Sequence, residues 1–474
     1  MCVDSKMAKV VYQETFDSVV LENVTEFDSP LDEAIDEAIK EFEAQGVHLG
    51  IIVKNMRLSE DKKTIVHDIL IALEKLRNAA DGSPVLEDIQ GPLTTFSAQC
   101  KVSIAHRVMA NNHGAYAVLL KLLKKVQRDP ALLGPSLKAM VAMTELNPDI
   151  LTGEGIQFLM ELIEDSKYSD NPTIPEYVAR WSTECCLKHE VNRQNLVAAG
   201  ALGSLVALLQ AQKSNSRVVK ATSKALRAYT LDDDIRQAFG KAHEHARLLA
   251  EEHGLIAISL DMIKDWLQDS DTASELLSTV GKLCVRAEYC QEIVDHGALH
   301  VINNVFVSFP DHPAINKQAM SLLKAMVGND KVKTEAMKSG VSQLIIAAII
   351  KHQAVVGVCE EGFGALSMLA LRVPAHAKQI IQAGGGQAII QAMKIHYNNM
   401  QLQKLGCMAI RNIGCRVPEN RQLFIEYGVE EVINSALQNH GEPIKDVAKA
   451  ALRDLDLKVD FVEQWRGTGH EICR

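Results

Sequence analysis

The 474-residue sequence has little of several features that define other protein classes. Aromatic residues make up 5% of the chain and proline occurs 13 times, so β-rich and low-complexity architectures are disfavoured. The longest apolar run, residues 344–350, is far shorter than the roughly 20 residues that a membrane-spanning helix needs. The first residues lack the apolar core of a secretory signal. We therefore expect an all-helical chain in the cytosol, with access to the nucleus as an additional expectation, and no membrane partner.

The sequence also lacks metal-binding cysteine motifs and an excess of basic residues. The ten cysteines include no Cys-x-x-Cys pair, which predicts reduced, buried thiols rather than disulfides or a zinc site. The chain has 50 basic and 60 acidic residues, net charge −10, so it lacks the basic character of a nucleic-acid-binding protein. The acidity is uneven, because residues 1–60 carry 13 acidic and 5 basic residues, net −8. We expect no nucleic-acid partner, no metal and no cofactor.

What the sequence contains is a repeated phrase, in which an apolar helix end is followed by glycine and a new apolar helix. Glycine supplies the positive φ that ends a helix, and a later helix carries small and large apolar residues, as in Ala365-Leu366-x-x-Leu369. One such unit cannot bury its own apolar face, so the units are expected to stack into a solenoid. The glycines, spaced by 41 to 54 residues, are Gly114, Gly155, Gly200, Gly254, Gly297, Gly340, Gly384 and Gly428.

The phrase Asn192-Arg193-x-x-Leu196-Val197-x-Ala199-Gly200 resembles the repeat of the armadillo family. The resemblance covers about residues 101–458, or eight units, and implies a right-handed armadillo-type α-solenoid, a superhelix of three-helix repeats with a concave groove. Further phrases near both ends, such as Gln13-Glu14-Thr15-Phe16-Asp17 and residues 446–455, are similar to one branch of that family with no assigned enzymatic activity. The resemblance therefore implies a non-catalytic protein.

The chain is expected to divide into three parts. Residues 1–63 comprise an acidic helical hairpin and a linker, because Ser29-Pro30 begins an amphipathic helix that Gly46 ends. We interpret this hairpin as a cap over the apolar end of the solenoid, and the alternatives are a docking module or an autoinhibitory segment. Residues 64–458 form about eight repeats, and residues 459–474 form a tail.

Ala242-His243-Glu244-His245-Ala246 is the most conspicuous candidate for chemistry. Two residues apart on a helix correspond to about 200°, which disfavours a shared metal ion. The alternatives are a plain helix with an additional turn in the long 54-residue unit, a metal-dependent activity, and methylhistidine at His243 and His245 as a histidine methyltransferase substrate. Asp232-Asp233-Asp234 is interpreted as the N-cap of the next helix, and no catalytic constellation is found.

The groove is expected to be the binding surface, because every third helix presents a row of side chains to it. Armadillo proteins that bind basic localisation signals carry Trp and Asn in this row, and only Asn412 keeps that pattern, so this function is disfavoured. Several positions are basic, which favours an acidic peptide or helix as partner, with plain solubility as the alternative. The candidate residues are Arg180, Glu184, Lys224, Arg227, Lys282, Lys324, Arg411 and Asn412.

These observations predict a monomeric, non-catalytic scaffold or adaptor that binds an extended or helical segment of a protein partner. The alternative is a transport or assembly factor that carries a client. A metal-dependent activity at His243 and His245 is a distant third hypothesis.

Overall fold

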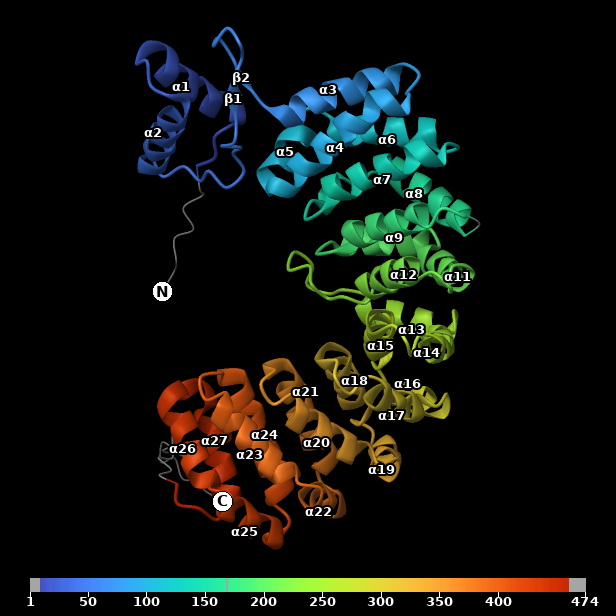
Figure 1. Ribbon diagram of the computed structural model, residues 1–474, viewed down its shortest axis with the longest axis vertical. Helices are drawn as coiled ribbons and strands as arrows, with labels where there is room; N and C mark the ends of the chain where they lie inside the picture. The colour runs from blue at the N-terminus through green and yellow to red at the C-terminus, as the bar shows by residue number, and fades with distance from the viewer. Residues whose placement is uncertain (1–8, 168, 460–474) are drawn as a thin grey trace, which may run out of the picture. The chain divides into compact units, whose positions relative to one another are not determined.

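The computed structural model describes residues 9–167 and 169–459, which form helices α1 to α27, one 3-10 helix and a two-stranded hairpin (Figure 1). The expected all-helical class is confirmed. The chain forms two compact units, Met1–Leu249 and Ala250–Arg474. Among the described residues no single helix has both the length and the apolar character of a membrane span, and only the bent pair Glu190–Ala198 with Ala201–Ala211 meets these two criteria together.

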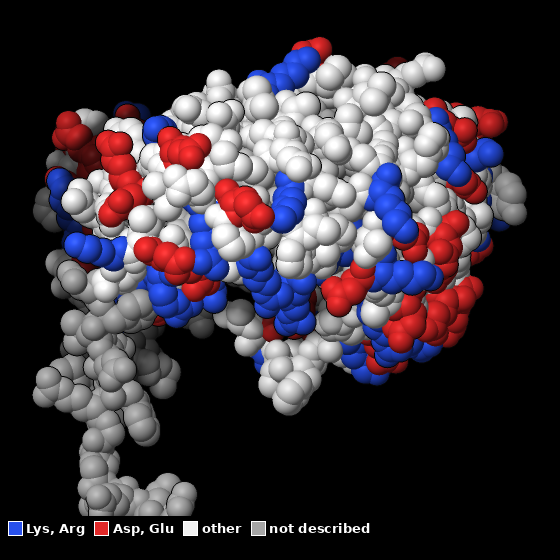
Figure 2. Space-filling model, turned by 90° about the horizontal axis from the view of Figure 1, so that it is seen from below, with Lys and Arg blue, Asp and Glu red and all other residues white. Residues whose placement is uncertain are grey.

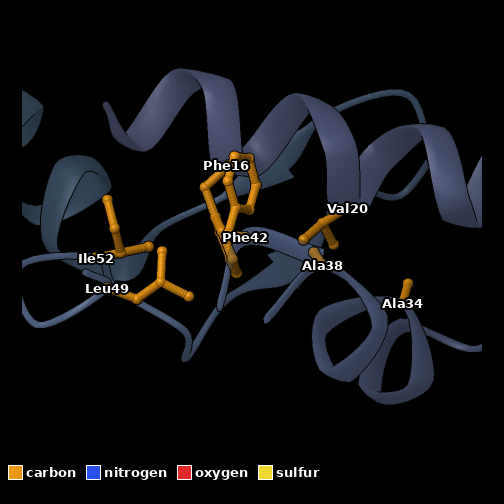
Figure 3. Close-up of a cluster of buried hydrophobic side chains, with 7 residues drawn as sticks. All are labelled: Phe16, Val20, Ala34, Ala38, Phe42, Leu49 and Ile52. Atoms are coloured by element: carbon orange, nitrogen blue, oxygen red, sulfur yellow. The ribbon is translucent and has the colours of Figure 1, made fainter. Parts of the chain in front are cut away.

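The N-terminal unit begins with a small module built on helices α1 (Gln13–Glu26) and α2 (Leu31–Ala44). Their apolar faces meet in a cluster in which the rings of Phe16 and Phe42 lie 5.8 Å apart (Figure 3). Leu49, which follows α2, is buried in the same cluster. Part of the segment expected to be a linker therefore belongs to the folded module.

The module is closed by a hairpin and joined to the first repeat by polar contacts. Strands β1 (Arg57–Leu58) and β2 (Ile65–Val66) pair antiparallel. His67 Nε2 lies 2.7 Å from Asp17 Oδ2 of α1, so this imidazole links the module to the start of the next helix. The interpretation of the module as a cap over the apolar end of the repeats stays a prediction.

The rest of the N-terminal unit consists of three-helix repeats. An incomplete repeat of α3 and α4 is followed by α5–α7, by η1–α9, in which a 3-10 turn replaces the first helix, and by α10–α12. The bounds are α3 (Asp68–Asp81), α4 (Leu86–Val102), α5 (Ile104–Asn112), α6 (Ala115–Val126), α7 (Pro130–Thr144), η1 (Pro148–Ile150), α8 (Gly153–Ser166), α9 (Thr173–Cys186), α10 (Glu190–Ala198), α11 (Ala201–Ala211) and α12 (Ser216–Ala228).

The same pattern continues through α13, which lies at the boundary of the two units, and through the C-terminal unit. The bounds are α13 (Ala242–Glu251), α14 (Leu255–Asp265), α15 (Ser270–Leu283), α16 (Ala287–Asp295), α17 (Ala298–Ser308), α18 (Pro313–Met326), α19 (Asp330–Lys338), α20 (Val341–Lys351), α21 (Val356–Ala370), α22 (Pro374–Gln382), α23 (Gly385–Ile395), α24 (Met400–Gly414), α25 (Pro418–Glu426), α26 (Val429–His440) and α27 (Glu442–Asp454).

The repeated glycine works as the sequence predicts. Gly384 has φ +88° immediately before α23, and a Cβ atom there would meet nothing within 4 Å, so backbone conformation and not space requires glycine. Gly155 is the exception, because it lies inside α8. The N–H of Gly155 donates a hydrogen bond to the side-chain oxygen of Thr152, the residue before the helix. A threonine N-cap therefore starts that helix in place of a left-handed glycine.

Successive third helices pack side by side within each unit, as α9 does with α12 and α21 with both α18 and α24 (Figure 1). We call the surface that they form the third-helix face: α7, α9 and α12 in the N-terminal unit, and α15, α18, α21, α24 and α27 in the C-terminal unit.

Candidate functional site

On the N-terminal unit, the basic residues predicted to bind a partner lie among acidic ones. The Arg180 guanidinium lies 5.0 Å from the ring centre of Tyr177 and 3.6 Å from the Glu176 carboxylate. Glu184 is half-buried, and burial raises the pKa of its carboxyl above the usual value. Lys224 and Arg227 lie on the last two turns of α12. This part of the face is therefore of mixed charge and not uniformly basic.

On the C-terminal unit, ion pairs between adjacent third helices take up part of the predicted basic row. Lys324 Nζ lies 2.6 Å from Glu361 Oε2 of α21, and Arg411 Nε lies 2.7 Å from Asp454 Oδ2 of α27. Lys282 is exposed near the end of α15 and has no carboxylate partner in the described part of the chain. Sequence patterns did not reveal these pairs because the partners lie in different repeats.

A cavity of about 570 Å³ lies on the C-terminal unit, between the C-terminal ends of α21, α24 and α27 and Arg421 of α25. It includes the predicted residues Arg411 and Asn412, and Asn412 Nδ2 donates a 2.8 Å hydrogen bond to Ser367 Oγ of α21. Five arginines and two aspartates line this arginine cavity, which gives its lining a formal charge of +3. They are Arg372, Arg411, Arg416, Arg421, Arg453, Asp454 and Asp456.

Three of the five arginines are held by the protein itself. Arg421 donates to the carbonyl oxygens of Gly414 (3.3 Å) and Cys415 (2.6 Å), and thereby satisfies the end of α24. Arg411 and Arg453 both bind Asp454. Burial disfavours the ionised form of Asp454, but these two hydrogen bonds outweigh it and lower the pKa of the carboxyl.

The other two arginines are not held by hydrogen bonds or ion pairs, although the charge of Arg372 acts on the nearby Asp330 carboxyl. Arg372 and Arg416 are exposed, and neither forms a hydrogen bond or ion pair with any residue in the described ranges. They lie 44 residues apart, one repeat period, and each lies two residues after the last residue of a third helix. The sequence analysis missed both because it followed the Ala-Leu-x-x-Leu positions. The repeat period itself is the signal that would have found them.

Charges of both signs gather on the surface near the C-terminal helices. Figure 2 shows Lys and Arg side chains concentrated along one edge, interleaved with Asp and Glu, beside a broad uncharged area.

The third predicted region, around Asp232-Asp233-Asp234, has a different role from the one expected. Asp234 Oδ2 accepts a 2.9 Å hydrogen bond from the Glu190 N–H, and Asp233 Oδ2 accepts one of 3.1 Å from the Lys188 N–H. These carboxylates therefore serve the N-terminus of α10, in the preceding repeat. The interpretation as an N-cap of the following helix is wrong, because residues 235–241 separate them from α13.

The chain between α12 and α13 forms a loop that is anchored by buried charge. Arg193 is fully buried and donates to Glu190 Oε2 (2.8 Å) and Asp233 Oδ1 (2.6 Å). Beyond these anchors, the side chains of Ile235 and Phe239 are 100% and 92% exposed. Figure 1 shows the loop extending away from the helices at the end of α12. The additional length of the 54-residue unit is therefore spent on this anchored loop and not on another helical turn.

The two histidines that follow the loop face different surroundings. His245 is buried and its Nδ1 lies 3.0 Å from the Tyr229 carbonyl oxygen, and burial lowers its pKa. His243 is exposed. Over the described residues, no group of three His, Cys, Asp or Glu side chains is placed to hold a metal ion. A methyltransferase would reach His243 directly, whereas His245 would first have to be uncovered.

Comparison with known proteins places this architecture in a family. The sequence model of the ARMC6 family matches residues 69–473. The sequence model of the Armadillo repeat-containing protein 6 N-terminal domain matches residues 8–67. The chain belongs to the armadillo repeat-containing protein 6 family. The resemblance inferred from the sequence is thereby confirmed.

Relatives in this family span most of the chain. Armadillo repeat-containing protein 6 of Homo sapiens is 36% identical over 472 residues, 97% of this chain and 93% of that protein. The Drosophila melanogaster homolog is 33% identical over 385 residues, 80% of this chain and 81% of that protein. The crystal structure of an engineered protein has a TM-score of 0.63 at 17% identity and covers 93% of this chain and 98% of its own, which supports the fold alone.

Proposed function

We propose that this armadillo repeat protein is a non-catalytic adaptor that binds an acidic segment of a partner protein at the arginine cavity. Armadillo repeat proteins are typically protein-interaction scaffolds, and the family assignment supports a role in protein binding. The proposal further places the adaptor in the cytosol, with access to the nucleus, as a monomer.

The observation that carries the proposal is the pair of unpartnered arginines. Helix C-termini carry partial negative charge, which accounts for arginines such as Arg421 that bind the last carbonyl groups. Arg372 and Arg416 make no such bond, so their charges are available to a ligand. A partner carboxylate would gain charge-assisted hydrogen bonds there, and the lining charge of +3 would favour its approach.

Three buried cysteines on the third helices are unsuited to act as nucleophiles. Burial raises the pKa of Cys186 and Cys407 to about 12 and that of Cys359 to about 11. Since the thiolate is the nucleophile, these thiols are poor nucleophiles at neutral pH. They act as small apolar residues in the packing of the third helices.

The test is binding of a fluorescent, glutamate-rich 15-residue peptide to the full chain by fluorescence anisotropy. Exchanging Arg372→Glu together with Arg416→Glu should weaken binding at least tenfold. The matched control is Arg286→Glu with Lys338→Glu, which changes the charge of the same unit equally at exposed positions outside the cavity. Equal weakening in both variants, or none in either, would overturn the proposal.

The client-carrying alternative is favoured by one observation, the exposed Ile235 and Phe239 on the anchored loop. Large apolar side chains that project from a fixed backbone suit a concave apolar pocket on a folded protein. Its test is a quantitative pull-down with two double variants. The first carries both Ile235→Ser and Phe239→Ser, and the loop control carries both Gln237→Ser and Ala238→Ser. Loss of a defined set of proteins in the first variant alone would support a client, and identical sets would reject it.

A further inference from the structure

The arginine cavity is small for a peptide groove but suited to a single charged group. Its volume of about 570 Å³ lies within the range of about 300–1,000 Å³ typical of small-ligand pockets. Its walls come from the C-terminal ends of three third helices in three consecutive repeats and from Arg421 of α25. A ligand here meets side chains from four helices or their ends, which favours recognition of one group and not of a long strand.

The charge of the lining distinguishes between possible ligand groups. Five guanidinium groups and two carboxylates leave a formal charge of +3. A glutamate side chain brings one negative charge, whereas a phosphorylated side chain brings about −1.5 to −2 at pH 7. The phosphorylated group therefore compensates more of the charge that the cavity concentrates.

The number of acceptor oxygens leads to the same choice. Each guanidinium offers a planar fork of N–H donors, and a fork binds two oxygens at once. A carboxylate has two oxygens, and one guanidinium group can bind both of them. A phosphoryl group has three oxygens, so two guanidinium groups can bind it from different directions. Arg372 and Arg416 supply two unpartnered forks to one cavity from equivalent positions of adjacent repeats.

The remaining arginines are already held in position. Arg411 donates through Nε to Asp454, and Arg453 binds the other oxygen of the same carboxylate. Arg421 is fixed by two carbonyl oxygens and Asp456. These bonds hold three positive charges at the wall of the cavity before a ligand arrives, which reduces the conformational entropy lost on binding.

We propose that the arginine cavity recognises a phosphoryl group on a phosphorylated serine or threonine of the partner protein, with Arg372 and Arg416 as its direct ligands. This inference rests on the proposed function, because it names the chemistry that the same cavity selects. Binding of the adaptor to its partner would then depend on phosphorylation of the acidic segment.

The experiment uses the full chain and three versions of the glutamate-rich 15-residue peptide, with serine, glutamate or phosphoserine at the central position. The phosphoserine peptide should bind at least tenfold more tightly than the glutamate peptide, and inorganic phosphate should displace it. Arg372→Lys with Arg416→Lys retains the charge but removes both forks. It should reduce the preference for phosphoserine to threefold or less, while Arg286→Lys leaves the preference unchanged.

Each outcome is decisive. Equal affinity for the glutamate and phosphoserine peptides would overturn the phosphoryl inference and leave the acidic-segment function standing. A preference that survives in the lysine variant would overturn the assignment to the two guanidinium groups. Failure of all three peptides to bind would overturn the proposed function together with the inference. Thermal unfolding of each variant shows that it folds like the parent chain.

Discussion

The anchored loop and the arginine cavity use the same residue types for opposite purposes. Arg193 and Glu190 of α10, which anchor the loop, have side chains that are 0% and 2% exposed, and their charges fix the loop backbone while its apolar side chains face outward. In the cavity, Arg372 and Arg416 are exposed and form no hydrogen bond or ion pair with a described residue, so their charges face outward. The difference teaches that burial decides whether an arginine serves the fold or remains available to a ligand.

The largest effect is expected from the buried side of this comparison. Replacing Arg193 by Met leaves Glu190 and Asp233 without their cation, and breaking a buried pair in this way costs about 3–5 kcal/mol of unfolding free energy. Urea unfolding of the parent chain and of the Arg193→Met variant, followed for the N-terminal unit, measures this loss of unfolding free energy.

The matched control is Arg217→Met, in which a 55% exposed side chain loses its ion pair with Glu176. This exchange should cost about 1 kcal/mol or less, because exposed ion pairs contribute little to stability. Similar losses in the two variants would remove the distinction between buried and exposed arginines.

The second prediction concerns salt. Exposed charges are screened by ions, so the affinity of the arginine cavity for the glutamate-rich peptide should fall by roughly threefold or more between 50 and 200 mM NaCl. The free energy of unfolding of the N-terminal unit should change little over the same range, since its ionic anchor is buried. Peptide binding that is insensitive to salt would contradict an electrostatic site.

The third prediction is that Asp454→Asn lowers the stability of the fold but raises the affinity for the acidic peptide. Loss of the ion pairs with Arg411 and Arg453 should lower the free energy of unfolding by about 1 kcal/mol or less. The formal charge of the lining rises from +3 to +4, so the acidic peptide should bind more tightly. Parallel unfolding and anisotropy measurements test this, and a weaker complex would show that Asp454 supports the ligand and does not compete with it.

The smallest effect is expected on acidification. Hydrogen bonds from Arg236 and from the Glu190 N–H hold the pKa of Asp234 well below its ordinary value of 3.8. A carboxyl with a depressed pKa contributes stability above its unfolded value, and this contribution is lost as the pH falls through the folded value. Unfolding between pH 5 and pH 2 should therefore show a steeper loss in the parent chain than in Asp234→Asn.

The repeats could be predicted because their signals are local. Gly384 and its equivalents need a positive φ, and the apolar spacing of each helix is read within a single unit. The segment after α2 was harder to predict, since Leu49 and Ile52 contribute to a core whose other members precede them by many residues. No local pattern separates such a segment from a linker.

The candidate site was only partly predictable for the same reason. Arg411 and Asn412 were found from the register of the third helices, and both line the cavity. Arg372 was missed because it lies outside that register, at φ +65° just beyond α21, where glycine is more usual. The ion pair that neutralises Lys324 joins two repeats and leaves no trace in either one alone.

The most direct test of the central claim is hydrogen–deuterium exchange of the full chain with and without the phosphoserine peptide. The account predicts that added protection is confined to the ends of α21, α24 and α27, around residues 371–372, 411–416 and 453–456, and is absent in Arg372→Glu with Arg416→Glu. Protection centred on another part of the chain, or the same protection in that variant, would contradict it.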